Sequence, residues 1–217
     1  QKTAYAIRLS LVGSEMCIRD RLSSFLNPLA NARTDSYGGK LENRYRLLLE
    51  IINATRRSVG PNFPISVKIN SSDFLRGGLT DQESATICKA LDSKGIDLIE
   101  ISGGNYENLA IFRGKDALND KNINEAYFLD SAKEILYTIK NTPFLLTGGI
   151  RKLSTMDDLI SNHNIDMIGL ARPICGLIDG PKKLIKKEEF QYSNNLCAAQ
   201  RTFADLPGTS PVSYTHL

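Results

Sequence analysis

The sequence has 217 residues, of which 41% are hydrophobic and 24% are charged, with a formal net charge of +3. This is the composition of an ordinary globular protein, and it contains no apolar run of the roughly 18 residues that a membrane helix needs. The densest basic run, residues 182–187, is interpreted as the solvated face of a late helix, so neither a membrane nor a nucleic acid is an expected partner.

Both ends of the chain have an unusual sequence. Residues 9–21 (LSLVGSEMCIRDR) and 211–217 (PVSYTHL) closely resemble translated sequencing-adapter read-through, and neither has a clear hydrophobic period. We therefore interpret residues 1–21 and 211–217 as non-native, with natural disordered termini as the alternative. Residues 191–217 are expected to form a tail, and the folded domain is expected within residues 22–190.

Between these ends, short β-type runs alternate with longer helical stripes, which is typical of successive βα units. Thr80 and Glu83 have the spacing of a capping box at a helix start, and Ser154 is the expected cap of a later helix. The predicted elements, in chain order, are a helix over 41–59, a strand over 64–70, a helix over 80–94, a strand over 97–102, a helix over 126–140, a strand over 143–147, a helix over 154–162, a strand over 166–171 and a short helix over 174–178.

Four βα units preceded by one helix make half of an eightfold barrel. The periodicity alone also permits an open, doubly wound parallel sheet, because both architectures use right-handed crossovers. The motifs at the strand ends have to decide between the two.

The four cysteines, at positions 17, 88, 175 and 197, include no CxxC pair and have no histidine at metal-ligand spacing. This pattern predicts no metal site and favours reduced thiols in the cytoplasm. Residues 1–21 contain a short apolar stretch without a convincing cleavage site, so a signal peptide is not expected.

The active site of a parallel barrel is built where its strands end. Gly148 and Gly149 follow the third predicted strand, and Arg172 follows the fourth. Glycines let backbone amides approach a phosphate, and an arginine can hold the phosphate oxygens with two parallel donors. Alternatively, the glycines make only a tight strand-to-helix connection, and Arg172 is a surface residue.

Lys68 lies near the end of an otherwise apolar strand, so its ammonium must reach the rim or meet a negative group. A reduced flavin supplies negative charge around N1 and the C2 carbonyl, where a fixed cation favours hydride uptake from NAD(P)H. The alternative is a structural lysine paired with a carboxylate of a neighbouring strand, such as Glu100.

Five segments form one ordered pattern: residues 25–46 (FLNPLANARTDSYGGKLENRYR), 64–79 (PISVKINSSDFLRGGL), 97–104 (DLIEISGG), 143–151 (PFLLTGGIR) and 167–173 (MIGLARP). The pattern resembles the old yellow enzyme family of NADH:flavin oxidoreductases and ene reductases. The resemblance covers about residues 22–180, and the combination of RTDSYGG with LENR is highly specific. Arg33, Asp35 and Arg44 of these two motifs are expected to form a local salt-bridge network.

The resemblance implies a (β/α)8 TIM barrel that binds FMN, of which about the last four βα units are present. It implies NAD(P)H as the reductant and an activated alkene or a quinone-like acceptor as the small-molecule substrate. By position, Lys68 matches the basic residue at the flavin pyrimidine edge, and Gly148 and Gly149 match phosphate-binding amides. Ala171 and Arg172 match the family's Gly-Arg phosphate pair, and alanine in place of glycine keeps the amide donor.

In the resembled family the substrate-anchoring His/His or His/Asn pair, the proton-donating tyrosine and the first flavin contacts come from earlier strands, and nothing before Leu22 resembles them. No catalytic residue is therefore predicted in this chain, which is expected to bind FMN weakly or not at all and to be inactive alone. Two alternatives remain. The chain is a noncatalytic half-barrel that self-associates as a homo-oligomer, or it is part of a flavin-free barrel enzyme that acts on a phosphorylated metabolite.

Overall fold

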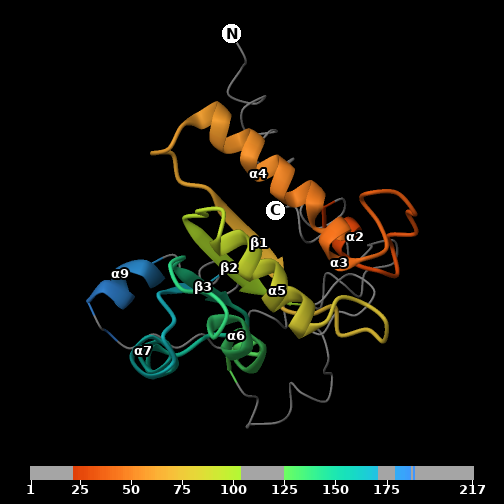
Figure 1. Ribbon diagram of the computed structural model, residues 1–217. Helices are drawn as coiled ribbons and strands as arrows, with labels where there is room; N and C mark the ends of the chain where they lie inside the picture. Colours follow the sequence, from red (N-terminus) through yellow and green to blue (C-terminus); the bar gives the residue numbers. More distant parts are fainter. Residues whose placement is uncertain (1–21, 104–124, 171–178, 187, 189–217) are drawn as a thin grey trace, which may run out of the picture.

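A parallel sheet lies at the centre of the computed structural model, which describes residues 22–103, 125–170, 179–186 and 188. Its strands follow the order β1-β2-β3-β4, and each strand pairs in parallel with the next one along the chain. Figure 1 labels the first three of them. This order has no reversal of direction across the described strands, as expected of a barrel and not of the switch point of a doubly wound sheet. The strands are β1 (Ser66–Asn70), β2 (Leu98–Ser102), β3 (Phe144–Thr147) and β4 (Met167–Gly169).

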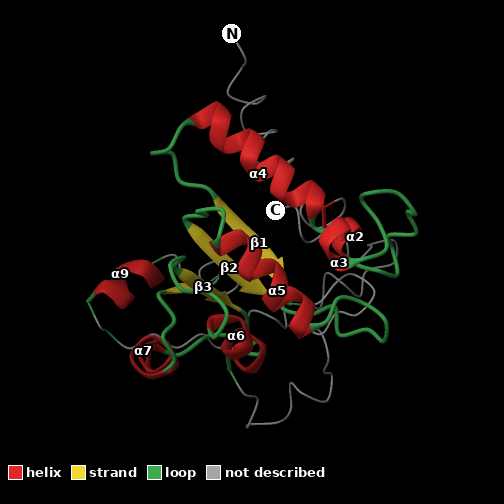
Figure 2. Ribbon diagram, viewed as in Figure 1, coloured by secondary structure: helices red, strands yellow, loops and turns green. Residues whose placement is uncertain are grey.

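Helices connect the consecutive strands, and α5 and α6 lie across one face of the sheet (Figure 2). The chain thus repeats a βα unit three times between β1 and β4, and each connection returns the chain to the end of the sheet where the parallel strands start. The described helices are α2 (Ser23–Leu26), α3 (Leu41–Arg44), α4 (Arg46–Val59), α5 (Asp81–Asp92), α6 (Leu129–Leu136), α7 (Leu153–Asn162) and α9 (Gly180–Ile185).

The two faces of the sheet differ in burial because side chains alternate along each strand. One face carries apolar side chains that are buried in the main hydrophobic cluster together with residues of α5 and α6. The opposite face carries mostly half-buried side chains, with Lys68, Glu100 and Thr147 among them. The buried residues from the strands are Val67, Ile69, Ile99, Ile101, Phe144 and Leu146, and those from the two helices include Ile87, Cys88, Leu91, Ala132 and Ile135.

Several predicted helix boundaries are corrected by the structure. The helix expected over residues 41–59 is two helices, α3 and α4, which meet at Tyr45 with φ −90° and ψ −2°. The helix expected over 126–140 is the shorter α6, because Ala126 has a φ of 57° in the left-handed region. Ser154 is not a cap: the N-cap position of α7 is Lys152, and Ser154 lies inside the first turn.

Other expectations are confirmed or lie outside the described residues. The Thr80 hydroxyl accepts from the Glu83 amide at 3.2 Å, and the Glu83 carboxylate accepts from the Thr80 amide at 3.2 Å, as the capping-box pattern predicts. The short helix expected over 174–178, the segments 1–21 and 211–217 interpreted as non-native, and the tail over 191–217 all lie outside the described residues. Within the described part of the chain, none of the helices combines the length and the apolarity that a membrane crossing requires.

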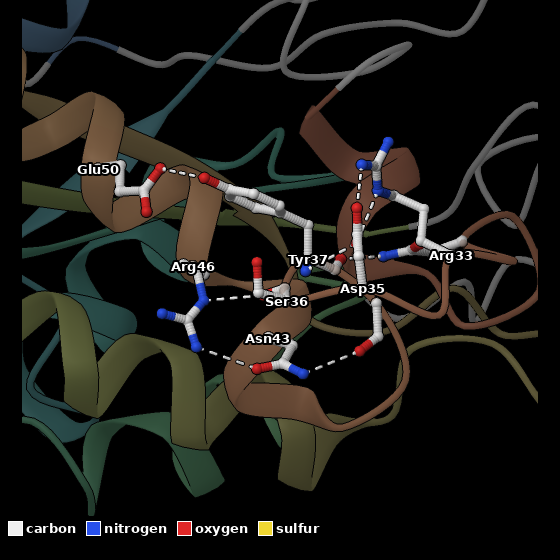
Figure 3. A network of polar contacts seen from close by, with 9 residues as sticks. Arg33, Asp35, Ser36, Tyr37, Asn43, Arg46 and Glu50 are labelled. Atoms are coloured by element: carbon white, nitrogen blue, oxygen red, sulfur yellow. Dashed lines mark hydrogen bonds and ion pairs between the residues drawn. The ribbon is translucent and has the colours of Figure 1, made fainter.

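The RTDSYGG segment folds into a polar loop that is hydrogen-bonded to α4 (Figure 3). Arg33 forms the expected ion pair with Asp35, and the Asp35 carboxylate also accepts from the Tyr37 amide at 3.0 Å. The hydrogen bond from Arg33, followed by that from the Tyr37 amide, lowers the pKa of Asp35. Gly38 is required here because a Cβ at this position would overlap the Arg33 carbonyl. The Tyr37 hydroxyl donates to Glu50 of α4 at 3.1 Å, which fastens the loop to the helix.

Arg44 does not join this loop network, which corrects the expectation that it would. Its side chain is 4% exposed, its guanidinium pairs with Glu83 of α5, and it donates to the Leu26 carbonyl. The residue therefore connects three helices, α2, α3 and α5, across a distance in sequence that no local pattern reveals.

Candidate functional site

Three polar side chains form a line across neighbouring strands on the face of the sheet away from α5 and α6. Lys68 of β1 and Glu100 of β2 are register partners, and the Lys68 Nζ lies 2.7 Å from the Glu100 Oε1. The Thr147 hydroxyl of β3 donates to the same carboxylate oxygen at 2.8 Å. Glu100 thus joins the cation of the first strand to the end of the third.

The pairing with Glu100 is the alternative that the sequence left open for Lys68. The ion pair leaves Lys68 able to bind a second partner, because an ammonium has three N–H donors and the Lys68 side chain is 28% exposed. The ion pair fixes the ammonium on the face of the sheet away from α5 and α6, called the inner face below, two residues before the C-terminal end of β1. Contact between Lys68 and a flavin stays a prediction.

Gly148 and Gly149 form the turn that leaves β3, with φ angles of 145° and 72°. The φ of Gly149 lies in the left-handed region, which glycine adopts without steric cost. A Cβ on Gly148 would lie 2.6 Å from the Phe128 ring, and a Cβ on Gly149 would overlap the Tyr127 ring. Within the described part of the chain, neither glycine amide donates a hydrogen bond, so both donors suit an added anion.

The structure brings Lys68 and the glycine turn to the same edge of the sheet. Thr147 directly precedes Gly148, and its hydroxyl reaches Lys68 through the Glu100 carboxylate. Ala171 and Arg172, the other two residues predicted to bind phosphate, lie outside the described residues. Their place relative to the turn therefore stays a prediction.

Sequence reasoning missed the segment that packs against this turn, residues 125–128. Here Glu125 binds the backbone beyond the turn, and Tyr127 and Phe128 cover the glycines. The aromatic pair gave no signal because Phe128 fits the apolar stripe of the following helix. Only the contact with the distant glycines reveals its place at the strand ends.

The sequence profile of the NADH:flavin oxidoreductase / NADH oxidase family matches residues 22–189. The chain belongs to this family. The match contains all four strands and the helices that connect them. It therefore includes Lys68, Glu100 and the glycine turn.

Relatives of this chain within the NADH:flavin oxidoreductase family include proteins of fungi and bacteria. The chain is 40% identical over 158 residues to an NADH-dependent flavin oxidoreductase, nadA, of Aspergillus parasiticus, which covers 71% of this chain and 34% of that protein. It is 30% identical over 162 residues to an NADH oxidase of Thermoanaerobacter brockii, with 75% of this chain and 24% of that protein covered. The chain thus spans about a third or less of the length of these relatives.

Solved structures give the architecture of the rest of the family. A 2-naphthoyl-CoA reductase aligns with a TM-score of 0.69 and 28% identity over 77% of this chain and 24% of that one. An old yellow enzyme homologue from Zymomonas mobilis aligns with a TM-score of 0.58 and 20% identity over 78% of this chain and 44% of that one. These are TIM-barrel proteins, so the described sheet is part of a TIM barrel, as the sequence predicts.

FMN as the cofactor and a reduced nicotinamide as the reductant are properties of this NADH:flavin oxidoreductase family, and both agree with the prediction from the sequence. The described residues fit part of such a cofactor. A fixed ammonium at Lys68 suits the electron-rich edge of a flavin, and the glycine amides suit a phosphate.

Proposed function

We propose that this chain supplies the phosphate-binding and pyrimidine-edge part of the FMN site in an oxidoreductase of old yellow enzyme type. The reaction passes a hydride from NADH or NADPH through FMN to an activated alkene or a related acceptor, and the bound flavin supplies the redox chemistry. Family membership and the names of the relatives support this assignment. They favour it over a flavin-free enzyme that acts on a phosphorylated metabolite.

The observation that carries the proposal is the connection from Lys68 through Glu100 and Thr147 to the glycine turn. A flavin mononucleotide needs a cation at its ring and anion-binding amides at its other end. This connection holds both features on one edge of one sheet. In a TIM barrel that edge is where active sites are built.

Each of these groups has a distinct task in the proposed site. The Lys68 ammonium stabilises negative charge at the pyrimidine edge and orients the ring. The amides of Gly148 and Gly149 donate to the phosphate, together with the Ala171 amide and the Arg172 guanidinium. Glu100 holds Lys68 in place and reduces the net charge that the ring meets.

The 217-residue chain by itself is proposed to bind FMN weakly and to lack turnover. The described residues provide four strands of an eight-stranded barrel, so they contact only part of a flavin. A flavin-binding domain over residues 22–190 and non-native segments over 1–21 and 211–217 belong to the same proposal. So does a cytoplasmic location, which suits the free thiol of Cys88.

Flavin fluorescence anisotropy, with the chain titrated into a fixed amount of FMN, tests the cofactor site. We expect weak saturable binding that Lys68→Met lowers about tenfold, because a charge-assisted contact is worth on the order of 1.5 to 3 kcal/mol. Lys68→Arg should keep most of the affinity, and Lys89→Met, which removes an exposed lysine of α5, should keep all of it. An FMN affinity that Lys68→Met leaves unchanged would contradict the proposed contact between Lys68 and the flavin. A tight one-to-one complex that oxidises NADH would contradict the proposed inactivity of the chain.

A second candidate is a noncatalytic half-barrel that self-associates, and the two outer strands of the sheet favour it. Among the described strands, β1 and β4 are each paired on one side only, and Met167 of β4 is 50% exposed. Unpaired parallel edges tend to add another strand. Light scattering after size exclusion should then show a dimer without flavin, which Met167→Lys disrupts. A monomer at all concentrations excludes this candidate.

A further inference from the structure

Glu125 binds the backbone just beyond the glycine turn. Its Oε2 accepts from the Arg151 amide at 3.0 Å and from the Lys152 amide at 3.1 Å. Its Oε1 lies 3.6 Å from the Arg151 Nε, and the side chain is 7% exposed. Because the carboxylate is shielded from water, these charge-assisted bonds are strong and hold the loop against the segment that carries Glu125.

The next residues of the same segment hold the turn from the other side. The Tyr127 amide donates to the Gly148 carbonyl at 3.2 Å, and the Tyr127 ring lies against Gly149. The Phe128 ring, 3% exposed, packs against Gly148 and against Gly103 at the end of β2. Residues 125–128 therefore hold the turn before and after its two glycines, and the carbonyl bond fixes the plane of the peptide that carries the Gly149 amide.

The carboxylate also decides which amides an anion can use. Arg151 and Lys152 directly precede α7, where backbone amides and the helix dipole attract negative charge. Glu125 occupies these two amides, and the negative charge of its carboxylate disfavours a second anion beside them. A phosphate is therefore directed to Gly148 and Gly149, whose amides donate no hydrogen bond within the described part of the chain.

We propose that Glu125 is a positioning residue of the phosphate subsite: it holds the turn of residues 147–152 so that the Gly148 and Gly149 amides, and not the start of α7, receive the phosphate of FMN. This inference rests on the proposed function, because it requires the glycine turn to bind phosphate. It adds a residue that acts on the selectivity for a phosphorylated flavin through the glycine turn.

The test compares FMN with riboflavin, which has the same ring and no phosphate. Anisotropy titrations give the affinity of the 217-residue chain for each flavin, and their ratio measures the phosphate contribution alone. We expect Glu125→Ala to lower this ratio about tenfold, since it releases two charge-assisted hydrogen bonds. Glu125→Gln, which keeps an amide oxygen as acceptor, should retain most of the ratio. Asp130→Asn, at a fully exposed carboxylate of α6, should leave it unchanged.

Each outcome decides the inference. Equal affinity of the unmodified chain for FMN and riboflavin overturns the phosphate site, and the role of Glu125 with it. A preference for FMN that survives Glu125→Ala overturns the role of Glu125 and leaves the proposed function standing. The same holds if both affinities fall equally, because that is the result of a structural role only. Should Glu125→Ala not fold, Glu125→Asp decides: its carboxylate is one methylene too short for both amides, and an unchanged ratio contradicts the inference.

Discussion

Arg44 places a guanidinium in the interior, with 4% of the side chain exposed. A buried ion pair contributes little net stability, yet removal of one partner leaves a charge without compensation in a medium that solvates it poorly. The partner is Glu83, whose side chain is 26% exposed and whose carboxylate also accepts from the Thr80 amide. Loss of the Glu83 charge therefore costs more than loss of an ordinary surface carboxylate.

Glu83→Gln should lower the free energy of unfolding by about 3 kcal/mol, because Arg44 stays charged and buried while the amide still caps α5. Urea denaturation followed by circular dichroism measures the change. Glu134→Gln, at an exposed position of α6, is the matched control and should have an effect within about 0.5 kcal/mol. Equal effects of the two substitutions would show that the Arg44 pair does not carry this energy.

Asp92, at the end of α5, holds the loop that leads into β3. Its carboxylate accepts from the amides of Lys140, Asn141 and Thr142 and from the Thr142 hydroxyl, at 2.7 to 3.1 Å. Burial opposes ionisation of this group, but the hydrogen bonds outweigh it and lower the pKa of Asp92 below its ordinary value of 3.8. The folded state therefore binds the proton of Asp92 less readily than the unfolded state.

A depressed carboxyl pKa stabilises the fold above the unfolded value and ceases to do so as the pH falls through the folded value. The stabilisation by Asp92 should be complete at pH 6 and decline below about pH 4. Asp92→Asn should reduce stability at pH 6 and should flatten the pH dependence in the acid range. Urea titrations at several pH values measure this, with Asp130→Asn as the exposed control. Parallel pH profiles of Asp92→Asn and the unmodified chain would contradict the assignment.

Among the elements, the pairing of β3 with β4 depends on one glycine. Thr147 and Gly169 are register partners, and a Cβ on Gly169 would overlap the Thr147 hydroxyl. The same hydroxyl donates to Glu100. A side chain at position 169 therefore disturbs the last strand pair and the polar line across the inner face together.

Gly169→Ala should destabilise the chain by about 1 to 3 kcal/mol, the usual cost of overpacking. Thr147→Ala in the same chain should recover part of the loss, because it removes the group that the new methyl meets. A double-mutant cycle from urea denaturation measures the coupling, and Thr147→Ala alone is the control. Strict additivity of the two substitutions would show that the clash does not decide the effect.

The elements also show which features of this fold a sequence can predict. The four strands and the Thr80 cap follow from local patterns, namely short apolar runs and a three-residue spacing. The structure confirms the cap and all four strands, although β1 starts two residues later than expected and β4 covers only Met167–Gly169. The start of α6 could not be predicted, because Ala126 leaves the helical region where residues 125–128 turn to contact Gly148. Tertiary contact overrides local propensity at that point.

The residues of the candidate site also differ in whether the sequence could predict them. Lys68 and the glycine pair were identified because strand ends in a parallel sheet meet at one edge, and the structure does bring them to that edge. Glu100 was named only as an alternative partner of Lys68, and it proves to be the group that joins Lys68 to Thr147. Glu125 was not identified, because its partners are backbone amides. Such amides occur at nearly every residue, so the sequence gives no sign of which ones a carboxylate binds.

For the molecule as a whole, the buried cluster under α5 and α6 gives a probe of global unfolding. Cys88 lies in this cluster with no exposed surface, and its burial raises the pKa of the thiol to about 12. Alkylation needs the thiolate and needs access, and the folded state denies both. Labelling of Cys88 therefore has to pass through the opening of the helix layer over the sheet.

We expect Cys88 in the folded chain to react with iodoacetamide at least about a thousandfold more slowly than in denaturant, since a domain of ordinary stability opens its core that rarely. Peptide mass spectrometry reads Cys88 separately from the other cysteines. In denaturant the rate should rise with pH towards the ordinary thiol value of 9.0, whereas thiolate formation inside the folded core requires a pH near 12. Fast labelling without denaturant would mean that four strands and their helices do not close a stable core by themselves. The same result would favour a chain that needs further strands, or a second copy, to fold.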